Sequence, residues 1–182
     1  FLLKNLIKIK LSMMKKLLTF AFALFTTFAF AQTFVSTTPE NKKVILEEFT
    51  GISCTFCPDG HVIGQGLHDA NPNDVFLINI HAGGYANPQG VGTDFRTSFG
   101  AAIDAQSGLA GYPAGTVNRH NFPGLEQGSA GATAMGRANW ATAAAQVLTE
   151  ASPVNVAVQS SVDLSTGLVT VDVEVYYTGT QT

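Results

Sequence analysis

The residues with the clearest capacity for chemistry are Cys54 and Cys57, the two cysteines of the chain, which are separated by two residues. A β-rich run, Val44 to Phe49, precedes them, and a stretch with apolar residues at helical spacing, Pro58 to about Asp69, follows them. At the start of a helix, unpaired N–H groups and the positive end of the dipole stabilise a thiolate over a thiol. The pattern therefore predicts a redox-active dithiol, with the second sulfur close enough to attack a mixed disulfide formed by the first.

Two other uses of this pair are open at this stage. A structural disulfide is the simplest, but closing so short a loop constrains very little of the unfolded chain. A copper or zinc site is the other, because Cys54, Cys57 and His61 form C-x2-C-x3-H and His81 ends a predicted strand near the same edge. A structural zinc site would need all four side chains. We favour a helix-surface His61 and a loop-facing His81, with no metal and no other cofactor.

Strand and helix patterns alternate around the dithiol. The run Val75 to His81 is almost continuously apolar, which predicts a central strand buried on both faces. Thr93 and Asp94 are placed to cap a helix that runs to about Gln106. A short strand is expected over Thr116 to His120, and an Ala-rich helix from about Asn139 to Glu150. The sequence therefore predicts an α/β domain over residues 32–151.

The pattern changes to a period of two after residue 152. Valines alternate with polar residues in two runs, separated by a turn at Asp163 to Gly167. Such alternation predicts a half-buried antiparallel hairpin over residues 152–182. Because two strands cannot hold a core of their own, we interpret them as the first hairpin of an incomplete all-β domain, and the chain as a fragment.

The segment 13–31 has the order of residues typical of a secretory signal peptide. Two lysines are followed by an apolar run from Leu17 to Phe30 and by small residues, Ala29 and Ala31. The apolar run is shorter than the about 20 residues that a membrane-spanning helix needs. We therefore expect the mature protein to begin at Gln32. Residues 1–12 precede any methionine, and we interpret them as an upstream extension.

Removing the first 31 residues makes the protein strongly acidic. Residues 32–182 contain five basic and thirteen acidic side chains, a net charge of −8. Such a surface repels phosphate backbones and anionic membranes, so nucleic acid is not an expected partner. The mature chain also has no expected transmembrane helix. We expect an exported protein in the periplasm, associated with the outer membrane or outside the cell.

Three segments resemble the active site of thioredoxin-fold proteins. These are the strand that ends in Glu48-Phe49, the motif Cys54-Thr55-Phe56-Cys57, and the proline segment Gly111-Tyr112-Pro113-Ala114. The strings EEFTGISCTFCPDGH and NIHAGGY resemble, within that superfamily, the Bacteroidetes outer-membrane-protein-28-like family, over roughly Lys43 to Arg119. The resemblance implies a thioredoxin-like domain with a central mixed sheet flanked by helices, followed by an Ig-like β-sandwich that is truncated here.

The resemblance also implies roles for individual residues. Cys54 would be the attacking thiolate and Cys57 the resolving thiol. Glu48 would be the buried carboxylate that manages the proton of Cys57; Glu47 competes for this role, and strand alternation lets only one of them point beneath the cysteines. Tyr112 and Pro113, joined by a cis peptide bond, would line the edge on which a substrate peptide docks.

The function that we expect is thiol–disulfide exchange on exported proteins, whose thiols and disulfides would be the partners together with an envelope redox protein. The alternative is a non-catalytic binding module of the cell envelope or outer membrane that keeps a fixed disulfide, because a fold does not by itself imply an activity.

Overall fold

The computed structural model describes residues 34–179. Within them the chain divides into two compact units, one built from residues 38–154 and 177–179, and the other from residues 34–37 and 155–176. The predicted extension and signal peptide, residues 1–31, lie outside the described residues. The larger unit holds both cysteines.

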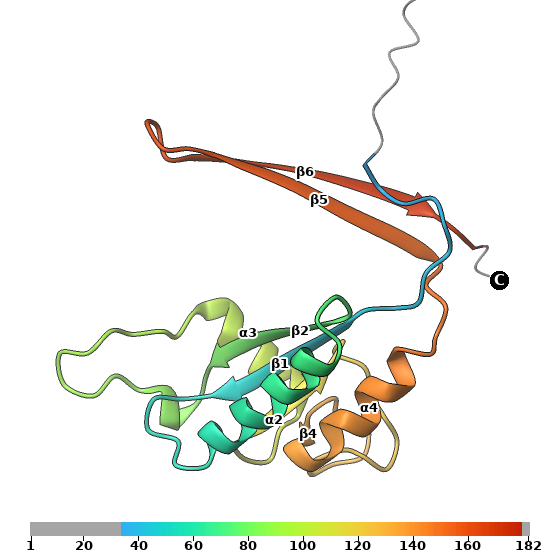
Figure 1. Ribbon diagram of the computed structural model, residues 1–182. Helices are drawn as coiled ribbons and strands as arrows, with labels where there is room; N and C mark the ends of the chain where they lie inside the picture. The colour runs from blue at the N-terminus through green and yellow to red at the C-terminus, as the bar shows by residue number, and fades with distance from the viewer. Residues whose placement is uncertain (1–33, 180–182) are drawn as a thin grey trace, which may run out of the picture. The chain divides into compact units, whose positions relative to one another are not determined.

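A four-stranded mixed sheet forms the centre of the larger unit. Its strands are β1 (Val44–Thr50), β2 (Val75–His81), β3 (Ala114–Val117) and β4 (Met135–Gly136), in the order β2-β1-β3-β4. β1 pairs parallel with β2 and antiparallel with β3, and β3 pairs antiparallel with β4. β1 is therefore an interior strand, and it runs directly into the loop that carries the cysteines (Figure 1).

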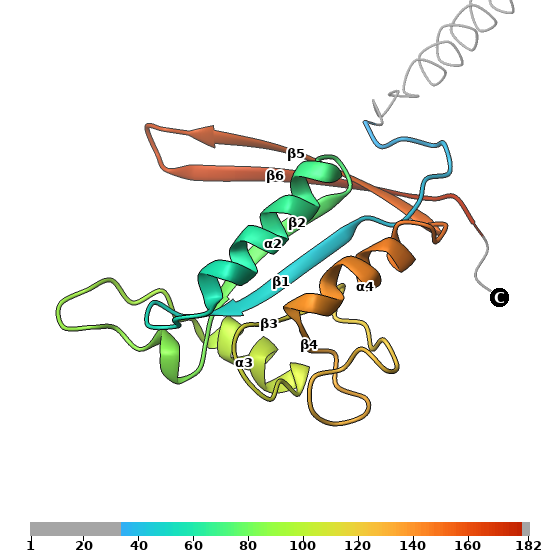
Figure 2. The same ribbon diagram turned by 60° about the horizontal axis from the view of Figure 1, so that its bottom comes forward.

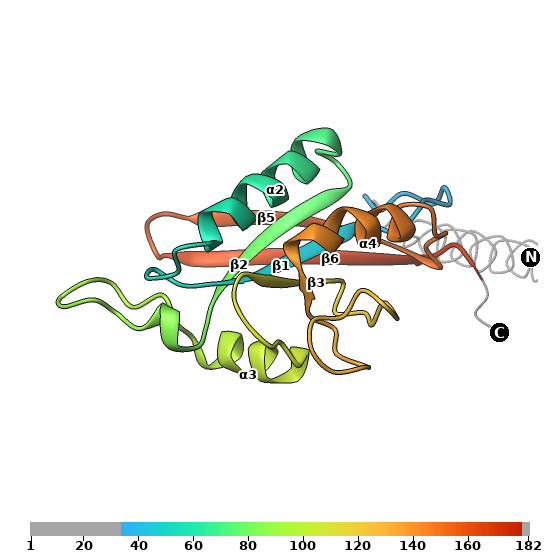
Figure 3. The ribbon, with the colours of Figure 1, turned by 90° about the horizontal axis from the view of Figure 1, so that it is seen from below.

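Helices cover both faces of this sheet. α2 (Cys57–Ala70) and α4 (Trp140–Val147) lie over one face (Figure 2), and α3 (Ser98–Ser107) lies on the opposite face (Figure 3). Two short 3-10 helices, η1 (Gly84–Ala86) and η2 (Arg137–Asn139), complete the helical elements. The predicted thioredoxin-like arrangement, a mixed sheet flanked by helices, is confirmed. Among the described residues, no helix is both long enough and apolar enough to cross a membrane.

The core under α2 and α4 is built around Trp140, which is fully buried. Its indole lies against Gly60 of α2 and Gly115 of β3, where an added Cβ would be 3.2 Å and 3.0 Å from the ring. Glycine at these two positions therefore lets α2, α4 and the sheet approach closely. On the other face Phe49 and Ile80 form the centre of a second apolar cluster, with residues of α3 packed against it. The two clusters fix β1 and its neighbours, and with them the position of the cysteine loop.

The expectation that Val75–His81 is a central strand buried on both faces is wrong. β2 is an edge strand of the four-stranded sheet. Val75 and Ile80 are buried, but Phe76 and Ile78 are 43% and 47% exposed. A continuous apolar run is compatible with burial on both faces, but it does not determine whether a further strand pairs with it. β1 occupies the interior position instead.

Two other boundaries differ from the expected ones. α3 begins at Ser98 and not near Thr93, because Oγ1 of Thr97 caps the helix by accepting a hydrogen bond from the N–H of Gly100 at 2.9 Å. β3 ends at Val117, because Asn118 and Arg119 adopt left-handed backbone conformations with φ of 51° and 49°. Because the cap is Thr97 and not Thr93, the loop between η1 and α3 is longer than expected.

The smaller unit contains the predicted antiparallel hairpin, β5 (Val154–Asp163) and β6 (Leu168–Tyr177). Backbone N–H groups of Phe34 and Val35 donate to the carboxylate of Glu174 at 2.6 Å and 3.0 Å, which ties the segment before the larger unit to this hairpin. The expected half-burial is wrong for the described residues, since seven valines are more than half exposed: Val156, Val158, Val162, Val169, Val171, Val173 and Val175. Within this unit the apolar face of the hairpin is therefore left exposed.

Candidate functional site

Cys54 and Cys57 form a disulfide at the start of α2, with their Cα atoms 5.4 Å apart. Cys57 is the first residue of the helix, and Cys54 lies in the turn that connects β1 to it. Cys54 is 8% exposed and Cys57 is 2% exposed. Both cysteines are therefore buried, and Cys54 is the less completely buried of the two.

The turn before Cys54 is held against the loop that contains η1. The N–H of Ser53 donates to the carbonyl of Tyr85 at 3.0 Å, and the N–H of Cys54 donates to the carbonyl of Gly51 at 3.0 Å. Gly51 packs so closely on the backbone of Tyr85 that a Cβ at this position would collide with it. These contacts fix the backbone of the cysteine turn. Glycine is required at position 51 because the loop that contains η1 approaches it so closely.

The Tyr112–Pro113 peptide bond is cis, as the sequence predicts. Pro113 is buried at the start of β3, and a Cβ on Gly60, in the first turn of α2, would lie 3.4 Å from Cβ of Pro113. The phenol of Tyr112 donates to Oδ1 of Asp104 at 2.8 Å, and burial together with this hydrogen bond raises the pKa of Tyr112 well above its usual value. The proline segment is therefore packed on the same helical turn that begins with Cys57.

Glu48 lies on the face of β1 that α2 covers, and its residue is 3% exposed. Gly64 of α2 stands directly over the carboxylate, where a Cβ would collide with it. Nδ1 of His61 lies 3.1 Å from Oε2 of Glu48. Burial raises the pKa of Glu48, and the charge and hydrogen bond of His61 oppose part of that rise. A buried carboxylate whose pKa is raised is a candidate for accepting and returning a proton.

Glu47 is also buried, at 4% exposed, but on the other face of β1. Its carboxylate accepts hydrogen bonds from Nε and Nη2 of Arg119 at 2.7 Å and 2.5 Å. This bidentate ion pair satisfies Glu47 fully and leaves it no role beneath α2. The alternation expected for the two glutamates is confirmed, and Glu48 is the one on the α2 face.

The two histidines proposed as metal ligands do not join the cysteines. The His61 imidazole is directed toward Glu48 and Thr50, and the ring of His81 contacts the ring of Phe95 with centroids 5.2 Å apart. Within residues 34–179, no group of three or more His, Cys, Asp or Glu side chains is arranged to hold a metal ion. The geometry of the described residues therefore gives the copper or zinc alternative no support.

Tyr85 is a site residue that the sequence analysis did not identify. Besides its backbone contact with the cysteine turn, its ring packs edge-on against the ring of Tyr112 with centroids 5.7 Å apart. The chain between η1 and α3 projects from the end of the domain at which the cysteine turn lies (Figure 1). Tyr85, Ile52 and Phe56 are 51%, 43% and 65% exposed, so apolar side chains flank the disulfide in the sequence and in space. The glycine pair Gly83-Gly84 before Tyr85 is the sequence signal for this loop.

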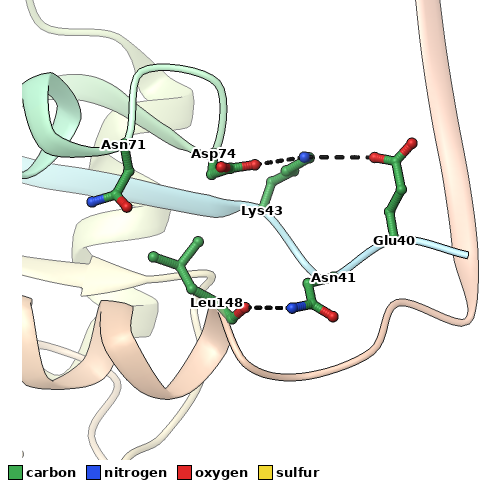
Figure 4. A pocket seen from close by; sticks show the side chains of 6 residues that line it. All are labelled: Glu40, Asn41, Lys43, Asn71, Asp74 and Leu148. Atoms are coloured by element: carbon green, nitrogen blue, oxygen red, sulfur yellow. Dashed lines mark hydrogen bonds and ion pairs between the residues drawn. The ribbon is translucent and has the colours of Figure 1, made fainter.

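A polar pocket of about 400 Å³ lies at the other end of β1, away from the cysteines (Figure 4). Its central side chain is Lys43, whose Nζ lies 2.6 Å from Oδ1 of Asp74 and 3.5 Å from Oε2 of Glu40. The side-chain amide of Asn41 donates to the carbonyl of Leu148 at 2.8 Å. The charged groups of this pocket satisfy one another, so it holds no free group for catalysis.

Comparison with known proteins gives a match among solved structures alone. No protein-family model matches the chain, and no curated protein matches it. Among solved structures, the chain is similar to HBP35 of Porphyromonas gingivalis, with 18% sequence identity and a TM-score of 0.46. The similarity covers 67% of this chain and 38% of that chain, so the present chain spans little more than a third of that protein's length.

Proposed function

We propose that the protein exchanges disulfides with exported proteins through Cys54 and Cys57. The observation that carries this proposal is the position of the disulfide, which joins the connection after an interior strand to the first residue of a helix. There the unpaired N–H groups of the helix favour the thiolate of Cys54 when the pair is reduced. A purely structural bond would constrain only the few residues between the two cysteines.

The neighbouring residues supply the other parts of such a reaction. Cys57, more buried than Cys54, is the resolving thiol, and Glu48 takes its proton. The backbone of Tyr112, beside the buried Pro113, offers an N–H and a carbonyl to an extended substrate segment, as in short β-strand additions. The exposed side chains of Ile52 and Phe56 provide an apolar margin that suits unfolded protein substrates.

The location that we propose is outside the cytoplasm, in the periplasm, at the outer membrane or beyond the cell. This rests on the signal-peptide pattern of residues 13–31 and on the acidic mature chain. We expect the secreted protein to begin at Gln32. Intact-mass measurement of material recovered from the cell envelope and medium checks this, and a mass that still includes the apolar run from Leu17 to Phe30 contradicts it.

The redox equilibrium of Cys54 and Cys57 tests the proposed exchange. We expect the protein, equilibrated in mixtures of reduced and oxidised glutathione or dithiothreitol and then alkylated, to pass from oxidised to reduced at a potential between about −120 and −270 mV. Enzymes that exchange disulfides fall in this range. The number of alkyl groups on each chain is measured by mass spectrometry. A Cys54→Ser/Cys57→Ser double variant, which has no thiol to alkylate, serves as the blank.

A bond that stays oxidised below about −300 mV would contradict the proposed exchange. That result would favour the other reading of the sequence, a cell-envelope binding module with a fixed disulfide. The burial of the two cysteines does not distinguish these functions, because a structural disulfide would be equally buried. The measured potential does distinguish them.

A further inference from the structure

His61 links the buried carboxylate of Glu48 to the surface of the domain. It lies in α2, one helical turn after Cys57. Its Nδ1 lies 3.1 Å from Oε2 of Glu48, and its Nε2 lies 3.2 Å from Oγ1 of Thr50. The His61 side chain is 38% exposed, whereas that of Glu48 is 4% exposed. The imidazole therefore reaches both the buried carboxylate and water.

No other group in the described part of the chain gives the Glu48 carboxylate a charge or a hydrogen bond. Its neighbours in the sheet are Asn79 of β2 and Gly115 of β3, which carry no charge. On the helix side Gly64 closes over it. A buried carboxylate needs a polar partner to stay ionised, so the interaction with His61 controls the ionisation equilibrium of Glu48.

The other charges near this turn of α2 are directed elsewhere. Asp59 forms an ion pair with Arg137, and it lies two residues before His61, on the opposite side of the helix. Pro113 and Trp140, which pack against the same turn, carry no charge. Among the described residues, the charged group in contact with His61 is therefore Glu48, and the disulfide-bonded Cys57 lies one helical turn before His61 in α2.

From this arrangement we propose that His61 is a positioning residue that keeps Glu48 ionised and passes protons between Glu48 and water. The inference rests on the proposed thiol–disulfide exchange and adds a residue to it. Imidazole is suited to the task because it takes up and releases protons between about pH 5 and pH 8. Its two nitrogens can also hold different partners at once, as they do here.

The step can be written for reduction of a substrate disulfide. The Cys54 thiolate attacks one substrate sulfur, a Cys54–substrate disulfide forms, and the other substrate sulfur leaves as a thiolate that takes a proton from water. Cys57 then gives its proton to Glu48 and attacks Cys54, so that the protein disulfide forms and the second substrate thiolate leaves. Two electrons pass from the protein dithiol to the substrate. His61 takes the proton from Glu48 at Nδ1, and the imidazolium releases one to water, where the leaving thiolate recovers it.

Titration of Glu48 in the oxidised protein tests the first half of the proposal without any reaction. The carboxyl carbon of Glu48 is followed by NMR against pH in the wild type, in His61→Gln and in His61→Lys. We expect the midpoint to move to higher pH in His61→Gln, because the amide keeps a hydrogen bond but supplies no charge. His61→Lys restores a positive charge and should return the midpoint toward that of the wild type. An unchanged midpoint in His61→Gln would overturn the proposal.

The rate of the second step tests the other half. A single-turnover reaction of the reduced protein with a disulfide peptide is followed between pH 5.5 and pH 8.5. We expect release of the second thiol to be roughly tenfold slower near pH 6.5 in His61→Gln, with the difference closing at higher pH. His68→Gln is the matched control, since His68 lies in the same helix with Nδ1 near the carbonyl of Val75, and it should keep the wild-type profile.

A Glu48→Gln background separates His61 acting through Glu48 from His61 acting alone. In that background His61→Gln should cause no further loss of rate, because the residue through which it acts is gone. An equal tenfold loss with and without Glu48 would overturn the proposal. A wild type that shows no exchange would overturn the proposed function, while the Glu48 titration would still show whether His61 controls the carboxylate.

Discussion

Replacement of Cys54 by serine is expected to reduce disulfide exchange by about 10³-fold or more, the scale of loss seen when an attacking nucleophile is removed. Cys54 is the less buried of the pair and lies just before the helix, so the proposed exchange assigns the attack to its sulfur, whose thiolate a helix end would stabilise. Reduction of a fluorescent disulfide peptide by catalytic amounts of the protein, with dithiothreitol as electron donor, measures this loss.

The Cys57→Ser variant is the matched control for that loss. It keeps the attacking sulfur and lacks the resolving one, so in the absence of dithiothreitol it should form one mixed disulfide with the peptide and then stop. Cys57 is nearly fully buried and starts α2, so it should also alkylate more slowly than Cys54 in the reduced wild type. Equal alkylation rates at the two cysteines over a pH series would show that these roles are assigned wrongly.

Replacement of Glu48 by glutamine is expected to slow the release of the second substrate thiol on the order of 100-fold, the lower end of what a positioned proton acceptor contributes. Glutamine has nearly the same shape and fits under Gly64, but it cannot accept the proton of Cys57. The first attack by Cys54 should keep its rate. Single-turnover kinetics that resolve the two thiols separate the steps, and an equal loss in both would mean that the variant has disturbed the cysteine turn.

The same substitution has a predicted effect on stability with a definite sign. Burial raises the pKa of Glu48 above the usual glutamate value of 4.5, so the folded chain binds this proton more tightly than the unfolded chain does. Binding of this proton therefore contributes fully to the free energy of unfolding below about pH 4.5. That contribution is lost as pH rises through the raised pKa of Glu48 in the folded protein. We expect Glu48→Gln to have a higher free energy of unfolding than the wild type at pH 7, and the two curves to converge near pH 4 in urea titrations.

Glu47→Gln provides the contrast for both measurements. It removes a charge from the other face of β1, where Arg119 pairs with the carboxylate. The Arg119 side chain is 48% exposed, so water solvates its guanidinium when the carboxylate is replaced, but one charge-assisted hydrogen bond is lost. This variant should therefore be somewhat less stable than the wild type at pH 7 and leave the order of thiol release unchanged. If Glu47→Gln slowed release of the second thiol and Glu48→Gln did not, the proton acceptor would be Glu47 and not Glu48.

The part of the fold closest to the cysteines could be predicted because it is encoded locally. The β-rich run before Gly51, the proline early in α2 and the helical spacing after it lie within about thirty residues and need no distant partner. The cis bond at Pro113 followed from the resemblance to thioredoxin-fold proteins. The edge position of β2 could not be predicted, because its apolar run has the same appearance whether or not a further strand pairs with it.

The sequence predicted where the residues of the candidate site lie on their strands and helices, but it did not predict most of the contacts that their side chains make. Alternation along β1 placed Glu47 and Glu48 on opposite faces, but it did not show that both are buried. The burial of Glu47 depends on its ion pair with Arg119, which follows β3 and is distant in the sequence. His61 stood out for its spacing from Cys57, which suggested either a ligand or a surface residue. Its contact with Glu48 depends on how α2 packs over β1, and spacing along the chain carries no information about that.

Trapping of mixed disulfides by the two single-cysteine variants tests the central claim most directly. Cys57→Ser and Cys54→Ser are reduced, exposed to a disulfide-containing peptide and to envelope extract, quenched with acid and compared by non-reducing electrophoresis and mass spectrometry. The account predicts stable adducts through Cys54 in Cys57→Ser and almost none in Cys54→Ser. Equal trapping by the two variants, or no adduct with either, would contradict it.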